Sequence, residues 1–152
     1  SSFLPCDALA EEAEYANIFD GKAVLGVSRN GVRLLDVITP AQYCKTNDLY
    51  VCIVSKAFVF AVPKIGKEKM RFWNHAGAHY AIISANGMTT RFGGNLIQYD
   101  IIRQRWEDVV VDYAHSDEYG VIAIQASNGH QLWLTGKCGF GAISDAAGCL
   151  EK

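Results

Sequence analysis

Three Asn-Gly pairs, each lying between two segments rich in apolar residues, constrain most strongly how this chain can fold. They stand at Asn30-Gly31, Asn86-Gly87 and Asn128-Gly129, within the sequences AVLGVSRNGVRLLDV, YAIISANGMTTRF and VIAIQASNGHQLWL. Asn and Gly both tolerate a positive φ, which fits them to two-residue hairpin turns whose twist matches that of the flanking strands. We therefore predict three antiparallel hairpins.

The longest continuous prediction covers Tyr80 to Val111. This stretch reads as a strand, the central Asn-Gly turn, a second strand and a break at Gly93-Gly94. A third strand over Asn95 to Asp100, a polar turn and a fourth strand over Trp106 to Val111 follow. Four short antiparallel strands of this kind form one sheet.

One segment has helical rather than strand character. Cys6 to Phe19 offers Asp7 as an N-cap, and Asp20-Gly21 follows as a stop signal. Its apolar residues recur at i, i+4 and i+7, which predicts one buried helix face; they are Leu9, Ala13 and Ala16.

Two segments in the middle of the chain have contrasting character. Leu49 to Val62 is almost continuously apolar, too long for one strand, and we expect two largely covered strands with a bend at Ser55-Lys56. Met70 to His79 mixes aromatic residues, histidines and a glycine. We interpret this second segment as a functional loop.

Charge and hydropathy exclude two classes of partner. The 152 residues include 14 basic and 16 acidic side chains, for a net charge of -2, and the basic ones are scattered. Such a balance gives no electrostatic attraction to nucleic acid or to an anionic membrane. No apolar run approaches the roughly 20 residues that a membrane-spanning helix needs. We expect neither nucleic-acid binding nor membrane insertion.

Five cysteines in one small domain favour an oxidising compartment. Cys44 and Cys52 flank a polar turn, and Cys138 and Cys149 bracket a Gly/Ala-rich segment, so we predict these two disulfides, with Cys6 left over. The chain starts Ser-Ser-Phe-Leu-Pro, as a processed secreted protein or a trimmed chain would. We expect a periplasmic or secreted protein. Five buried thiols in a cytosolic protein are the alternative, since free Cys is often buried.

A resemblance rests on the second half of the chain. Ile83 to Val110 resembles a β-propeller blade, in which a Ser-x-x-Gly turn joins two strands and a Tyr-Asp ends a third; Ser84, Gly87, Tyr99 and Asp100 match. The third hairpin, followed by Gly-Lys-Cys and a last Cys, is similar to the C-terminal part of periplasmic immunity proteins that neutralise peptidoglycan-amidase effectors of type VI secretion. This likeness implies an inhibitor of such an amidase.

These observations together predict a mainly β fold. We expect a single domain over residues 1–152, with an N-terminal α-helix over 6–19, an antiparallel β core over 22–135 and a loop-rich, disulfide-tethered tail over 136–152. The chain is too short for a closed ring of four-stranded blades. The hairpins should therefore form a partial or distorted propeller-like arrangement or a sandwich.

A second functional hypothesis is a papain-like cysteine amidase. Cys6 would be the nucleophile at the start of the predicted helix, His79 would lead into the strand YAIIS, and Asp100 or Gln98 would orient it. Against this, neighbouring acidic residues would raise the pKa of the thiol.

Our leading interpretation is a protein-binding domain whose loops fill the active-site cleft of a cell-wall amidase. A metal site is not expected, because Gly77 separates His75 from His79 and no HExxH pattern follows. Nothing in the sequence suggests a cofactor. The residues expected to contact the partner lie at hairpin tips and in the loop over 73–79; they are Arg29, Asn30, Trp73, Asn74, His75, Asn86 and Asn128.

Overall fold

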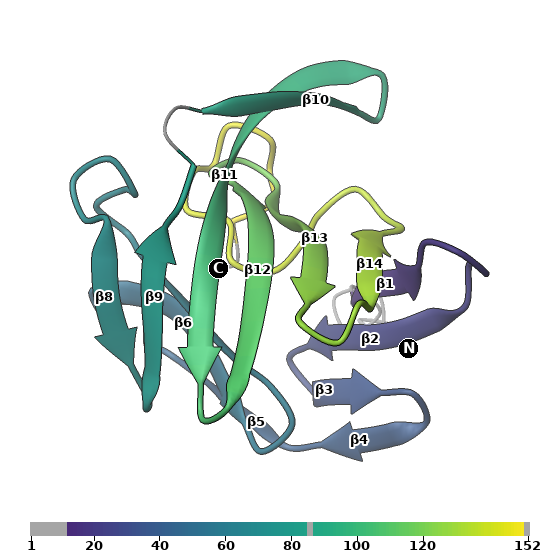
Figure 1. The fold of residues 1–152 in the computed structure, drawn as a ribbon. Helices are drawn as coiled ribbons and strands as arrows, with labels where there is room; N and C mark the ends of the chain where they lie inside the picture. Colours follow the sequence, from purple (N-terminus) through teal and green to yellow (C-terminus); the bar gives the residue numbers. More distant parts are fainter. Residues whose placement is uncertain (1–11, 85–86, 151–152) are drawn as a thin grey trace, which may run out of the picture.

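The computed structural model describes residues 12–84 and 87–150, and these form an antiparallel β protein (Figure 1). Fourteen strands follow one another, with no helix in the described ranges. The strands are β1 (Ala13–Asn17), β2 (Ala23–Ser28), β3 (Gly31–Leu34), β4 (Val37–Thr39), β5 (Ala41–Tyr43), β6 (Tyr50–Ser55), β7 (Val59–Pro63), β8 (Phe72–His75), β9 (Ala78–Ile82), β10 (Met88–Phe92), β11 (Asn95–Trp106), β12 (Val109–Ser116), β13 (Gly120–Ala126) and β14 (Gln131–Leu134).

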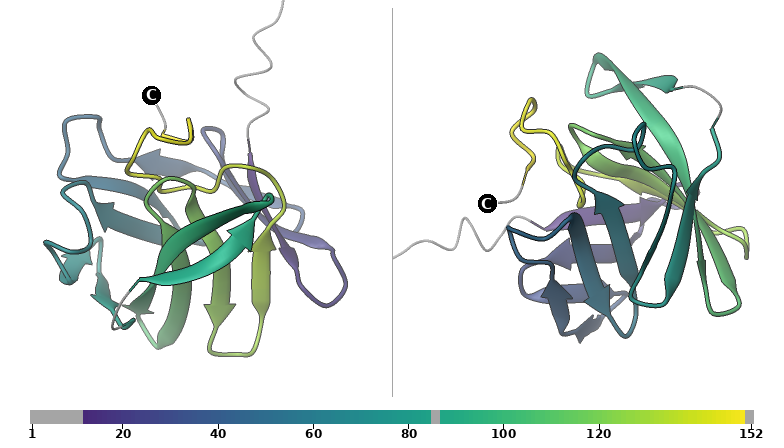
Figure 2. Two further views of the ribbon diagram at one scale, coloured as in Figure 1. Left: turned by 90° about the horizontal axis from the view of Figure 1, so that it is seen from above. Right: turned by 90° about the vertical axis from the view of Figure 1, so that its left-hand side faces the viewer.

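Most strands belong to one strongly curved sheet of eleven strands. Its main path runs β4-β3-β2-β1-β14-β13-β12-β11-β9-β8, and β10 pairs with the N-terminal half of β11. The pairing of β1 with β14, in which Tyr15 lies opposite Leu134, joins the beginning of the described chain to its last strand. Figure 2 shows how the sheet curves round.

A second sheet of three strands, in the order β5-β6-β7, covers the inner face of the large one. Every residue of β7 is buried. The ring of Phe60 on β7 contacts Tyr113 on β12 at a centroid distance of 4.8 Å and Tyr80 on β9 at 6.1 Å. The core therefore lies between the two sheets, and the apolar run over 49–62 forms two strands, β6 and β7, as expected.

A buried amide ties the sheets together within this core. Nε2 of Gln104 donates to the carbonyl oxygen of Val59 at 2.6 Å, and its Oε1 accepts from the hydroxyl of Tyr113 at 2.9 Å. A second contact, at 3.0 Å, links Nε2 to the hydroxyl of Tyr80. Burial raises the pKa of Tyr80 to about 12. All of the polar atoms that Gln104 brings into the core thus have partners.

The C-terminal segment has no strand or helix over 136–150 and packs on the large sheet. Gly139 passes so close to β13 that a Cβ would lie 2.1 Å from the carbonyl oxygen of Val121. The neighbouring Phe140 is buried, and its carbonyl accepts from the amide of Val121 at 2.8 Å. The disulfide Cys138–Cys149 closes the segment on itself.

Both predicted disulfides, Cys44–Cys52 and Cys138–Cys149, are present, and the prediction of a mainly β, antiparallel fold is confirmed. The N-terminal helix is wrong over its described part, because Ala13–Asn17 is a strand hydrogen-bonded to β2 and β14. Residues 6–11, including Cys6, lie outside the described ranges. The propeller-like arrangement is also wrong, since the described strands form one long path and a three-stranded cover rather than radial blades.

The hairpin predicted around Asn86-Gly87 is not formed either. The preceding strand β9 pairs with residues 102–106 of β11, whereas β10 pairs with residues 95–99 of the same strand. β9 and β10 therefore both pair with β11, at opposite ends of this long strand. The segment predicted as a functional loop is a tight hairpin between β8 and β9.

Candidate binding site

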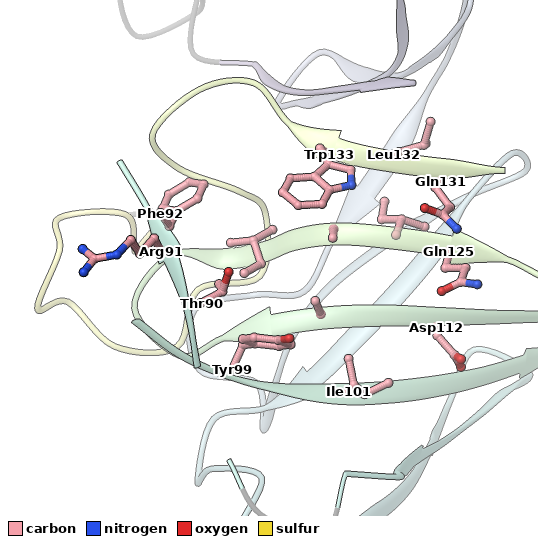
Figure 3. A pocket seen from close by; sticks show the side chains of 14 residues that line it. Thr90, Arg91, Phe92, Tyr99, Ile101, Asp112, Gln125, Gln131, Leu132 and Trp133 are labelled. Carbon is pink, nitrogen blue, oxygen red and sulfur yellow. The ribbon is translucent and has the colours of Figure 1, made fainter. Parts of the chain in front are cut away.

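A groove of about 240 Å³ lies on the outer face of the large sheet, next to the hairpin of β10 and β11 (Figure 3). Its floor follows from the register of four neighbouring strands. Four residues on adjacent strands form one row across this floor, each lying opposite the next: Trp133, Ala123, Ala114 and Ile101. Two alanines between two large side chains leave an unfilled channel along this row, because successive side chains stand roughly side by side on a sheet face.

Aromatic side chains form the walls of the groove. Trp133 is 55% exposed, although its neighbours Leu132 and Leu134 point into the core. Figure 3 shows Tyr99 across from it and Phe92 at the end nearest the hairpin. Aromatic rings around a concave surface are typical of a binding site, because they offer large apolar area at a low cost in side-chain entropy.

The opposite end of the groove is polar. Asp112, Gln125 and Gln131 lie in one row of the sheet and converge there in Figure 3. Arg103 donates to Asp112 from Nε at 2.8 Å and from a terminal nitrogen at 2.9 Å. This hydrogen bonding raises the pKa of Arg103. The groove thus offers two amides and a neutralised carboxylate, which suit hydrogen-bonding groups better than a free charge.

The hairpin of β10 and β11 stands clear of the rest of the sheet (Figures 1 and 2). Gly93 and Gly94 form its tip with φ angles of 58° and 84°, the left-handed region that a two-residue turn of this hand requires at both positions. Leu96 is 68% exposed on one strand and Met88 is 43% exposed on the other. The hairpin therefore carries exposed apolar side chains away from the body of the protein.

Two contacts hold this hairpin in place. The ring of Phe92 packs against Tyr119 at a centroid distance of 5.2 Å, in an edge-to-face arrangement. Ile97, on the same face of the hairpin as Phe92, is buried in the core cluster. The hairpin is anchored along its length, so its exposed side chains keep one orientation.

A buried lysine, paired with two partly exposed carboxylates, fixes the base of the hairpin. Nζ of Lys67 lies 3.2 Å from Asp100 on β11 and 3.2 Å from Asp117, and it donates to the backbone carbonyl of His115 at 2.7 Å. Ser84 donates to the other oxygen of Asp100 at 3.2 Å. The two residues Ser84 and Asp100, singled out by the resemblance, are thus in contact.

Burial and the nearby Lys67 charge hold the pKa of His115 well below its usual range. Asp117 lies 3.9 Å from its Nδ1 and would favour the protonated ring, but the loss of hydration outweighs that attraction because His115 is fully buried. Its Nε2 contacts the carbonyl oxygen of Gly141 at 2.7 Å. A neutral His115 therefore joins β12 to the C-terminal segment.

The predicted partner contacts do not form one surface. Arg29 and Asn30 form the β2–β3 turn, and Asn128 lies in the β13–β14 turn, where its Oδ1 accepts from the amide of His130. These two turns lie near opposite ends of strand β1, because Ala13 pairs with Val27 and Asn17 with Leu132.

The other predicted contacts lie on β8 or outside the described ranges. Trp73 is 4% exposed, stacks on Tyr80 and donates from its indole nitrogen to Ala61 at 2.8 Å, so it belongs to the core. Asn74 is exposed, and His75 is half-buried. Asn86 is not among the described residues.

His79, the histidine of the amidase hypothesis, is exposed on β9. Its Nδ1 lies 2.5 Å from Oδ1 of Asn74, directly across the β8–β9 hairpin, so Asn74 rather than Asp100 or Gln98 orients it. His75 and His79 lie on opposite faces of this hairpin, because His75 pairs with Ala78 and His79 with Asn74.

Sequence reasoning missed the groove. Its signal was present in Gln131–Leu134, where the exposed Trp133 alternates with two leucines, and in the small residues Ala114 and Ala123 on neighbouring strands. These residues become a site only through the pairing of β11, β12, β13 and β14, which local patterns do not reveal.

Comparisons with protein families, with curated proteins and with solved structures give no match for this chain. A search of the described residues for a helix long and apolar enough to cross a membrane finds none.

Proposed function

We propose that this chain is an exported protein-binding domain that inhibits a cell-wall amidase by inserting the β10–β11 hairpin into the enzyme's active-site cleft. The observation that carries the proposal is the exposed, anchored hairpin beside an aromatic groove. A rigid projecting element loses little conformational entropy on binding, so more of its contact energy appears as affinity.

Hairpin and groove offer complementary contacts. Leu96 presents apolar area close to the Gly93-Gly94 tip, and Met88 does so at the other end of the hairpin, opposite Tyr99. The exposed Trp133 borders the groove beside the two alanines of its floor. Buried aromatic anchors usually carry most of the binding energy of an interface. A partner would thus surround the hairpin and place an apolar side chain in the groove.

The nature of the partner rests on two lines of support. The third hairpin, followed by Gly-Lys-Cys and a last Cys, resembles the C-terminal part of the immunity proteins described above, and this segment includes Trp133 of the groove. The two disulfides are compatible with an oxidising, exported location, where a cell-wall enzyme would be met. The proposed location is the periplasm or the exterior of the cell.

The test uses an amidase encoded next to the gene for this chain, because immunity genes lie beside the toxins that they counter. Purified chain and enzyme should form a one-to-one complex, and peptidoglycan cleavage should stop at that ratio. An enzyme that keeps its full rate with excess chain present would rule out the inhibitor.

The cysteine amidase remains a second candidate because of one observation. Asn74 holds the ring of His79 through Nδ1, which leaves Nε2 available to take a proton from a thiol. Alkylation of Cys6, or Cys6→Ala, should then abolish peptidoglycan cleavage by the chain itself. Purified chain that cleaves no peptidoglycan would remove this candidate and leave the inhibitor untouched.

A further inference from the structure

We propose that reduction of the disulfide Cys44–Cys52 creates a Zn²⁺ site, with the two cysteine thiolates and His75 as its protein ligands. Cys44 follows β5, Cys52 lies in β6 and His75 ends β8. The ligand atoms of the three residues all lie within 4.8 Å of one another. Two thiolates and an imidazole form a donor set that suits zinc.

The distance between the imidazole and one sulfur already suits a metal. Nε2 of His75 lies 3.6 Å from Sγ of Cys44. Tetrahedral zinc, with Zn–S near 2.3 Å and Zn–N near 2.0 Å, separates sulfur from nitrogen by about 3.5 Å. His75 therefore needs no rearrangement, and rotation of the two reduced cysteine side chains would bring both sulfurs to a shared ion.

Neighbouring groups fix the histidine in this position. The β8–β9 turn is formed by Ala76 and Gly77, with φ angles of 49° and 82°, and it places His75 directly opposite Ala78. The ring of Tyr50 on β6 meets the imidazole edge-to-face at a centroid distance of 5.1 Å. A ligand that is already oriented costs less entropy on metal binding.

The burial of the three residues leaves room for a fourth ligand. Cys52 is buried, whereas Cys44 and His75 are half-buried, so one side of the cluster reaches solvent. A water molecule would complete the tetrahedron, as in zinc sites with three protein ligands. Because β6 belongs to the small sheet and β8 to the edge of the large one, the ion would link the two sheets.

Metal binding is controlled by the oxidation state of the two sulfurs. In the disulfide they are bonded to each other and have no thiolate to offer. A phosphine reductant supplies two electrons and becomes a phosphine oxide; its oxygen comes from water, whose two protons convert the sulfurs to thiols. Zinc then displaces both thiol protons as it binds.

The experiment uses the full chain with Cys6→Ser, Cys138→Ser and Cys149→Ser, so that only the proposed pair remains. We expect one Zn²⁺ per chain after phosphine reduction and none before it. Co²⁺ in place of Zn²⁺ should give thiolate-to-metal absorption bands. Near-ultraviolet circular dichroism reports whether the reduced chain remains folded.

Two histidine variants complete the test. His75→Ala should weaken Zn²⁺ binding at least about tenfold, which is the lower end of what outer-shell partners contribute. His79→Ala, on the opposite face of the same hairpin, should leave it unchanged. The proposal is overturned by a reduced chain that binds no metal, by binding that only an unfolded chain shows, or by equal affinity in His75→Ala.

Discussion

Nζ of Lys67 donates a hydrogen bond to the backbone carbonyl of His115 at 2.7 Å, across 48 residues of sequence. The same ammonium group neutralises Asp100 at the base of the projecting hairpin and Asp117 at the end of β12. One buried cation therefore ties the loop after β7 to the two strands that carry the proposed binding site.

Replacing this cation should destabilise the protein strongly. Lys67→Met removes the positive charge but keeps most of the side-chain volume, and it leaves two carboxylates close together without their partner. Breaking a buried ion pair costs about 3 to 5 kcal/mol, and the half-exposed carboxylates favour the lower value. Urea denaturation measures the loss, with the exposed Lys69→Met as control. Equal stability of the two variants would contradict the role of Lys67.

The stability of the protein should fall as the pH drops below about 6.5. The folded pKa of His115 lies below its unfolded value, so the unfolded chain binds a proton more readily in this range. Through this histidine, the free energy of unfolding falls by at most about 1.4 kcal/mol for each pH unit below that value. Above the unfolded pKa, His115 does not change the free energy of unfolding. Urea denaturation at several pH values should show a smaller slope in His115→Gln; an unchanged slope would argue against a buried neutral histidine.

The β8–β9 turn contains a residue in an unfavourable conformation. Ala76 has a φ of 49°, where a Cβ is normally crowded. Ala76→Asn should raise the free energy of unfolding by less than the roughly 1 to 2 kcal/mol that the left-handed conformation costs an ordinary L-residue, because Asn tolerates this region better. Thermal denaturation checks the gain. Gly77→Ala, at a φ of 82°, should lower the free energy of unfolding. A lower free energy of unfolding in both variants would contradict the unfavourable backbone conformation at Ala76.

Thiol titration tests the covalent framework. The chain has five cysteines, and four are paired as Cys44–Cys52 and Cys138–Cys149. Unfolded without reductant, the protein should show one reactive thiol per chain, that of Cys6, and five after reduction. Cys138→Ser with Cys149→Ser should cost about 3 kcal/mol in the chain-entropy estimate for a loop of this size. Five thiols before reduction would contradict both pairings.

Local patterns predicted the strand content, two of the three Asn-Gly hairpins and both disulfides, because these features depend on neighbours in sequence. They failed where distant pairing decides the structure. Ala13–Asn17 has helix-compatible residues, but Tyr15 is fully buried and donates to the carbonyl of Val121 at 2.6 Å, so tertiary contacts override local propensity.

The same reason explains the second failure. Asn86-Gly87 has the composition of a hairpin turn, yet β9 and β10 both pair with the twelve-residue β11 instead of with each other. No local signal indicates that β11 continues through the polar residues that were predicted to form a turn. The groove depends on this long strand, and so it was not predicted.

The measurement that tests the proposed function most directly compares two matched surface variants for binding to the cognate amidase. Leu96 on the hairpin is 68% exposed, and Val37 on the edge strand β4 is 66% exposed. Leu96→Asp should raise the Kd at least about tenfold, because it places a charge in the buried centre of the interface. Val37→Asp should leave the Kd unchanged. Equal affinity of both variants and the original chain would contradict insertion of the hairpin.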